Sequence, residues 1–348
     1  MANSPQFVSN RIDVPDSIDE INELFYRRGW TDGLPIVPPT EERVAQMLSG
    51  TSRNPQDILG AMPPRWGEAT VEKVAINAVM AGCLASYMPV VITAIEALLE
   101  PEFNLYAIQA TTHPVAPLVL INGPIRKQLG ANSGYNVFGQ GTRCNATVGR
   151  AIRLVLINVG GGIHGKLDRA THGQPSKYTF CIAENEEQSP WSPFHVDRGY
   201  ATSVSTVTVG GFENPYNIND HSSDDATGLL TTIAGSMTHQ GSNDILYQYV
   251  HSEIMVVIGP EHASTIANSG YSKADVRRYL FENARVTKGS FSERHQKERF
   301  PNFMPGDLIP VATNEERILI VVAGGAGKHS MCCPSFGMTH SVTKEIKP

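Results

Sequence analysis

The sequence lacks the features that mark several large classes of protein. Its 348 residues include only five scattered cysteines, too few for a disulfide-stabilised scaffold. The apolar stretch 88–99 contains Thr93 and Glu96 and is too short to span a bilayer. The first fifteen residues are polar, so no secretory signal is expected. These absences predict a cytoplasmic protein with reduced thiols.

Neither sign of charge forms a block in the sequence. The 28 basic and 34 acidic residues give a net charge of −6. Binding to nucleic acid or to an anionic membrane surface normally needs clustered Lys and Arg, so neither partner is expected. Apolar residues make up 41% of the chain, which is the composition of a globular protein with a sizeable core.

The apolar periodicity predicts an α/β or mixed α+β fold, with a central sheet, flanking helices and a helical N-terminal region. Residues 1–60 are expected to form a helical and extended N-terminal arm, and residues 61–348 an α/β catalytic domain, possibly continuous with it. Thr40 is an expected helix N-cap, and Gly29 an expected helix end. The expected strands are 115–121, 178–183, 203–209, 254–258 and 318–322, and the main helices are 70–83, 90–99, 145–158, 263–268 and 273–283. No internal repeat is evident, and residues 284–307 are expected to form a surface excursion.

Polar or glycine-rich segments follow three of the expected strands. Asn122 follows the strand 115–121, an acidic segment 184–187 follows 178–183, and a glycine-rich segment 324–329 follows 318–322. In open α/β sheets, ligands bind beyond the carboxyl ends of strands. If the three strands are parallel neighbours, the loops converge on one site, with Asn122 among its binding residues.

The glycine-rich segment has two interpretations. Short glycine loops at strand ends are often simple tight turns. Alternatively, the amides of Gly325 and Gly327, together with Lys328, bind an anion, and His329 takes part in catalysis. The segment has neither the spacing of a phosphate-binding P-loop nor that of a dinucleotide fingerprint, so no nucleotide cofactor is expected.

Glu184 and Glu186 are candidates for proton transfer. They follow an apolar strand, and Trp191 is close to them in sequence. A carboxyl group beside an apolar wall can have a raised pKa and act as a general acid or base. The alternative is a solvated acidic turn. Arg150 is a candidate substrate-binding residue, and its alternative role is a structural ion pair.

A possible metal site has regular spacing. His164, Asp168 and His172 lie four residues apart and would share one face of a helix. Imidazole and carboxylate groups suit a divalent metal such as zinc. Glycines at 160–162, 165 and 173 surround the run, so the alternative is a loop whose side chains bond to backbone.

Cys332 is a candidate catalytic thiol. It lies close in sequence to Lys328 and His329, and nearby cations lower the pKa of a thiol. Cys83 is expected at the C-terminal end of a helix, where the helix dipole disfavours a thiolate. Cys83 is therefore expected to be an inert core residue.

Four longer motifs occur together: WTDGLPIVPPT at 30–40, EKVAINAVMAGC at 72–83, residues 145–161, and KYTFCIAENE at 177–186. As a set they resemble a poorly characterised microbial family that is fused to, or found beside, UGSC domains, named after their Sec/Cys-Gly-Ser-Cys signature. The resemblance implies thiol-dependent chemistry on a small molecule and a small thiol- or selenol-bearing partner subunit. This chain has no Cys-Gly-Ser-Cys sequence of its own. Either a separate subunit supplies the thiols, or this member does not use them.

These observations predict an enzyme that acts on a small anionic organic molecule by metal- or thiol-assisted carbon–heteroatom bond chemistry. A lyase or hydrolase and a thiol-linked reductase both fit the sequence. The alternative is a non-catalytic scaffold subunit for a small redox-active thiol protein. A homo-oligomer is expected in either case.

Overall fold

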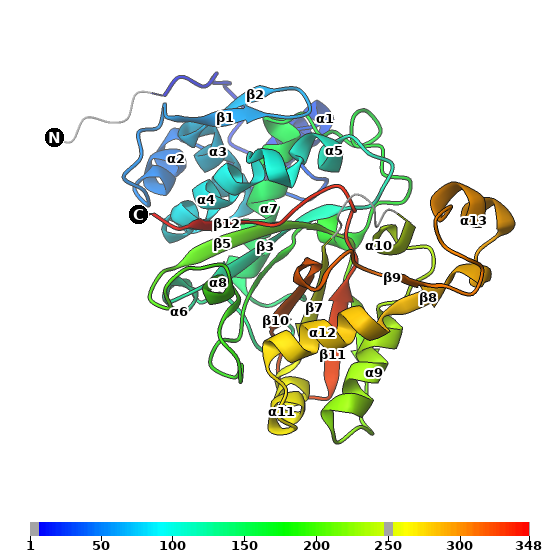
Figure 1. Cartoon of the computed structure of the whole chain (residues 1–348). Helices are drawn as coiled ribbons and strands as arrows, with labels where there is room; N and C mark the ends of the chain where they lie inside the picture. The colour runs from blue at the N-terminus through cyan, green and yellow to red at the C-terminus, as the bar shows by residue number, and fades with distance from the viewer. Residues whose placement is uncertain (1–6, 247–252, 348) are drawn as a thin grey trace.

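The computed structural model describes residues 7–246 and 253–347. These residues form four layers, in which two sheets pack face to face and helices cover both outer faces (Figure 1). The predicted mixed α+β class is confirmed. The central β-structure consists of two sheets rather than one.

The first helical layer is formed mainly by the N-terminal part of the chain. The predicted N-cap Thr40 accepts a hydrogen bond from the Arg43 amide, and Gly29 ends its helix with a φ of 68°. Residues 7–60 contribute Phe25 and Val44 to the core that they share with later helices. The elements of this layer are α1 (Ile18–Arg28), α2 (Glu41–Leu48), α3 (Val71–Ala81), α4 (Met88–Leu98), α5 (Leu105–Gln109) and α7 (Arg143–Asn158), with the hairpin β1 (Ile58–Met62) and β2 (Gly67–Thr70).

Each central sheet has four strands. The first sheet has the order β12-β5-β3-β4, with β12 (Val342–Glu345), β5 (Thr206–Phe212), β3 (Ala116–Asn122) and β4 (Cys181–Ala183). The second has the order β10-β7-β11-β6, with β10 (Ile318–Val322), β7 (Ile254–Ile258), β11 (His329–Cys333) and β6 (Tyr216–Asn219).

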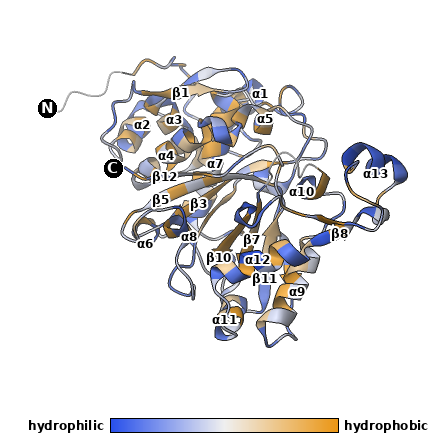
Figure 2. Ribbon diagram, viewed as in Figure 1, coloured by the Kyte–Doolittle hydropathy of each residue, from blue (hydrophilic) through white to orange (hydrophobic). Residues whose placement is uncertain are grey.

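The second helical layer covers the outer face of the second sheet. It contains α9 (Ala226–Ser236), α11 (Pro260–Asn268) and α12 (Lys273–Asn283). The predicted excursion is present as β8 (Arg285–Thr287), α13 (Glu293–Arg299) and β9 (Leu308–Pro310), and α13 is hydrophilic throughout (Figure 2). Three short helices complete the fold: α6 (Ile125–Leu129), α8 (Phe194–Asp197) and α10 (Asn243–Leu246).

Alternation along the strands explains why two sheets can stack. In β7, Val256 and Ile258 pack against the second helical layer, whereas Met255 and Val257 point toward the first sheet. A strand that is buried on both faces needs apolar residues at every position, which is why the sequence shows continuous runs rather than alternation. The residues between the sheets form a core of their own.

The two sheets repeat one topology. Strands β12, β5, β3 and β4 correspond to β6, β11, β7 and β10, with the same order and the same parallel or antiparallel pairings. The edge strands are exchanged, because β6 follows β5 in the chain but pairs in the second sheet, and β12 follows β11 but pairs in the first. The two crossing segments meet at an antiparallel bridge between Phe212 and Ser335. The amide of Glu213 donates to Pro334 O, and that of Phe336 donates to Gly211 O. The sequence shows no sign of this repeat.

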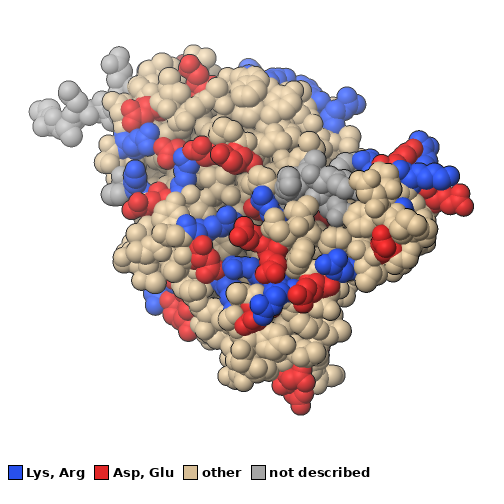
Figure 3. All heavy atoms as spheres, viewed as in Figure 1, with Lys and Arg blue, Asp and Glu red and all other residues tan. Residues whose placement is uncertain are grey.

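Basic and acidic side chains are interspersed on the face shown in Figure 3, with no extended area of one sign. Within the described ranges, no helix combines the length and the apolar character that are needed to cross a bilayer.

Candidate functional site

The loops after β4 and β10 meet at one edge of the stacked sheets. The amide of Asn185 donates to Val322 O at 2.7 Å, and its side chain donates to Gly324 O at 3.3 Å. Contact between these two loops, which is part of the predicted convergence of three, is therefore present. Its geometry differs from the expectation, because β4 and β10 belong to different sheets instead of being neighbours in one.

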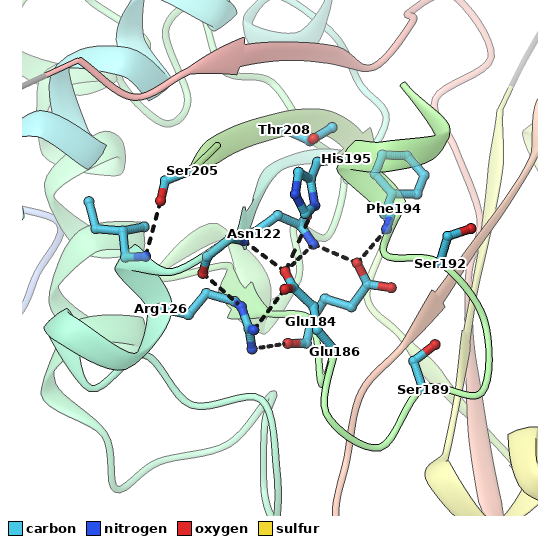
Figure 4. Close-up of polar contacts among 12 residues, drawn as sticks. Asn122, Arg126, Glu184, Glu186, Ser189, Ser192, Phe194, His195, Ser205 and Thr208 are labelled. Atoms are coloured by element: carbon cyan, nitrogen blue, oxygen red, sulfur yellow. Dashed lines mark hydrogen bonds and ion pairs between the residues drawn. The ribbon is translucent and has the colours of Figure 1, made fainter. Parts of the chain in front are cut away.

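A buried acidic cluster lies on the first-sheet side of this edge (Figure 4). Asn122, the last residue of β3, donates to Glu184 Oε2 at 2.5 Å and to Glu186 Oε1 at 3.0 Å. The amide of Phe194 also donates to Glu184 Oε2, at 2.7 Å. The Oε1 atom of Glu184 is buried and has no hydrogen-bond partner among the described residues. Burial raises the pKa of Glu184 to about 7.

Arg126, from α6, neutralises the other carboxylates of the cluster. Its guanidinium contacts Glu186 at 2.8 Å and Glu187 at 3.0 Å, and donates to Glu184 O at 2.7 Å. The hydrogen bond from Arg126 lowers the pKa of Glu187 to about 2. His195 Nδ1 lies 3.9 Å from Glu186 Oε1, and burial lowers the pKa of His195. Glu186 is thus ion-paired with Arg126, and Glu184 is the carboxyl group of the cluster whose pKa lies near neutral pH.

A cavity of about 290 Å³ lies on the second-sheet side of the same edge. Residues 135–139 form one wall, and residues 323–327 and 329–331 form the other. Asn217, Val257 and Gly259 complete the lining. None of the lining residues is an Asp or Glu, and neither Glu184 nor Glu186 reaches the cavity. The volume suits a small molecule.

The cavity and the acidic cluster occupy equivalent places in the repeated topology. The amide of Glu184 donates to Ile121 O, and the amide of Ala323 makes the corresponding bond to Ile258 O, both at 3.2 Å. Large charged side chains follow β4, whereas alanine and glycine follow β10. The small residues leave the space that forms the cavity.

His329, the first residue of β11, lines this cavity and belongs to a short polar chain. Its Nδ1 lies 3.0 Å from Asn217 Oδ1, and its Nε2 lies 3.3 Å from His221 Nε2. Lys328 does not line the cavity, and its ammonium group donates to His221 O at 3.1 Å. His329 is the one candidate catalytic residue from the sequence that reaches the cavity.

The glycines beside the cavity differ in what their backbone contacts. The Gly324 amide donates to Ser133 O, and the Gly327 amide donates to Glu261 Oε1 at 3.0 Å, so these two amides already have partners. Gly325 is required by a close approach, because a Cβ atom there would lie 2.0 Å from Cδ1 of Tyr135. The predicted anion nest of glycine amides is therefore partly filled by the protein's own carboxylate.

Arg150 lies away from the cavity and fastens the 30–39 segment. Its guanidinium makes two hydrogen bonds to Asp32, at 2.8 and 2.9 Å, and a third to Pro35 O at 2.8 Å. The structure gives Arg150 the alternative role, a structural ion pair with Asp32, and Arg150 does not line the cavity. The WTDGLPIVPPT motif thereby gains a structural explanation.

The helix expected for His164, Asp168 and His172 is absent. Residues 164–168 form a turn closed by an isolated bridge, and Asp168 pairs with Lys177 at 2.6 Å. Because the spacing of His164, Asp168 and His172 places them on one face only in a helix, the turn does not bring the three side chains together. No cluster of three or more His, Cys, Asp or Glu placed to hold a metal occurs in the described parts of the chain.

All five cysteines are free and buried. Burial raises the pKa of Cys332 well above its usual range, and raises the pKa of Cys83 to about 12. The cations that the sequence places near Cys332 do not offset this effect. The assignment of Cys332 as a reactive thiol is not supported by its surroundings.

We expect the native protein to react slowly with a thiol reagent. At pH 8, fewer than one thiol per chain should react with 5,5′-dithiobis-(2-nitrobenzoic acid) on the timescale on which all five react in denaturant. The released thionitrobenzoate is measured by its absorbance. Rapid reaction of one native thiol that is lost in C332S would restore Cys332 as a candidate nucleophile.

Several residues of the site carried no usable signal in the sequence. Arg126 and His195 lie on very short helices whose positions the apolar periodicity does not predict. Asn217 and His221 reach His329 only because β6 pairs in the second sheet. Only the proximity of Arg126 to Asn122 in the chain could have indicated its role.

No protein-family model and no curated protein matches this chain. The resemblance to the UGSC-associated family, with its thiol- or selenol-bearing partner, therefore stays a prediction.

Proposed function

We propose that the chain is an enzyme that binds a small anionic organic molecule in the cavity between residues 135–139 and 323–331, and that His329 and His221 form its reactive centre. The reaction class is carbon–heteroatom bond cleavage of the lyase or hydrolase type. The observation that carries this proposal is His329 on the cavity wall, with its ring oriented by Asn217.

The charges around the cavity support an anionic substrate. Its lining has no carboxylate, and Lys328 lies beside His221, so the nearby charge favours an anion. The Gly327 amide donates to Glu261 Oε1, so this loop accommodates a carboxylate. A thiol-linked reaction would need a partner protein, because the chain's own cysteines are buried.

Adding a methyl group to the cavity wall should weaken anion binding. In G325A the new methyl group meets the Tyr135 ring, which must move and disturb the cavity. We expect at least one of acetate, succinate, citrate and phosphate to raise the melting temperature of the wild type, and to bind G325A about tenfold more weakly or worse, a loss of about 1.4 kcal/mol. Differential scanning fluorimetry and isothermal titration calorimetry measure both effects.

The matched control is G235A, because Gly235 lies on α9 with open space around its Cβ position. It should bind the same anions as the wild type. Equal binding by G325A and the wild type, or the failure of every anion to bind, would contradict the proposed substrate class.

A further inference from the structure

The imidazole of His329, on the cavity wall, lies with its Nε2 atom next to the Nε2 atom of a second histidine, His221. His221, in the loop after β6, and His329, at the start of β11, place their Nε2 atoms 3.3 Å apart. The ring planes are nearly perpendicular, at 81°. Both side chains are exposed, so burial does not force the two rings together.

Asn217 determines which nitrogen of His329 is free. An amide oxygen can only accept a hydrogen bond, so Nδ1 of His329, 3.0 Å from Asn217 Oδ1, carries the hydrogen. The Nε2 atom then presents a lone pair toward His221. Histidines that bind metals characteristically have this arrangement, with the second ring nitrogen donating to an oxygen.

The loop that carries His221 is held by several hydrogen bonds. Asp220 accepts hydrogen bonds from the amides of Ser222 and Ser223 and from Thr232 Oγ1. Its backbone oxygen lies 3.1 Å from Nε2 of the buried His262. The backbone of His221 is thus positioned by contacts that do not depend on His329.

We propose that His221 and His329 together bind one divalent transition-metal ion, of which Zn²⁺ is the best match, at the edge of the cavity. Two imidazole nitrogens bound tetrahedrally to Zn²⁺ at about 2.0–2.1 Å are separated by about 3.3–3.4 Å. The observed separation of 3.3 Å equals that edge of the tetrahedron. The site is distinct from the His164, Asp168 and His172 set.

Two protein ligands leave two coordination positions for water and substrate. The ion would polarise an oxygen of a bound anion or lower the pKa of a bound water molecule. Because His329 lines the cavity, this inference rests on the proposed function for the place where the ion acts. Metal binding itself can be measured without any substrate.

The test is titration of the metal-free full chain with Zn²⁺ by isothermal titration calorimetry, and with Co²⁺ by visible absorption. The wild type should bind one ion saturably, and H221A and H329A should each lose that binding. N217A should bind about 10- to 100-fold more weakly, whereas N217D, which keeps an acceptor oxygen, should retain binding. H172A is the matched control, because His172 is exposed and has no role in the site.

Binding that persists equally in H221A and H329A, or the absence of saturable binding by the wild type, overturns the metal site. The anion panel is repeated on chelator-treated wild type. Anion binding without metal binding would contradict the metal site alone, and metal binding without anion binding would contradict the proposed function alone.

Discussion

Replacing Arg150 with alanine is expected to lower the free energy of unfolding by about 3–5 kcal/mol, because it leaves the buried carboxylate of Asp32 without its partner. The Asp32 side chain is only 3% exposed. Arg150 also donates to Pro35 O, so the variant loses this hydrogen bond to the 30–39 segment as well as the ion pair. Urea denaturation followed by circular dichroism measures the change.

R278A is the matched control for R150A. Arg278 pairs with Asp275 on α12, where the Arg278 side chain is 55% exposed, and solvent screens such a pair. We expect its loss to cost less than about 1 kcal/mol. R150K should fall between the two, because an ammonium group cannot make the paired hydrogen bonds of a guanidinium. Similar costs for R150A and R278A would show that Arg150 does not fasten the segment.

Replacing Glu184 with glutamine should change how stability depends on pH. The pKa of Glu184 is about 7 in the folded protein, because of burial, and 4.5 in its ordinary state. As pH rises above 4.5, the unfolded chain releases the proton first, so the wild type loses stability until the pH passes about 7. This loss is about 3 kcal/mol, at about 1.4 kcal/mol per pKa unit. E184Q cannot ionise, so relative to the wild type it should gain about that amount between pH 4 and pH 8.

Unfolding of E184Q and wild type by urea at several pH values measures this difference. E187Q serves as the comparison. The hydrogen bond from Arg126 lowers the pKa of Glu187, so the contribution of Glu187 to stability changes with pH in the opposite direction. The wild type gains stability from Glu187 above its ordinary pKa and loses it on acidification, so E187Q should lose stability at neutral pH. A constant difference between E184Q and wild type across the range would show that folding does not raise the pKa of Glu184.

Much of the secondary structure follows from local patterns. The expected helix 273–283 and strand 254–258 match α12 and β7 in full, and Pro89 lies in the first turn of α4. These elements have strong apolar patterns and clear end signals. The strand expected at 178–183 is reduced to Cys181–Ala183, since residues 175–177 form a 3-10 turn.

The arrangement of the strands could not be derived from those patterns. A strand buried on both faces has the same apolar sequence whether helices or another sheet cover it, so β3 and β7 gave no indication of two stacked sheets. The placement of His329 beside Asn217 depends on the pairing of β6 with β11, which joins residues more than a hundred positions apart. Glu184 was found because its position after a strand is a local feature.

The exchange of β6 and β12 interlocks the two halves of the molecule. A polypeptide that ended after β6 would carry an edge strand with no sheet to join, and its own sheet would lack β12. Each fragment would lack the edge strand that the other half supplies to its sheet, so rebuilding both four-stranded sheets by fragment complementation would require both pieces together.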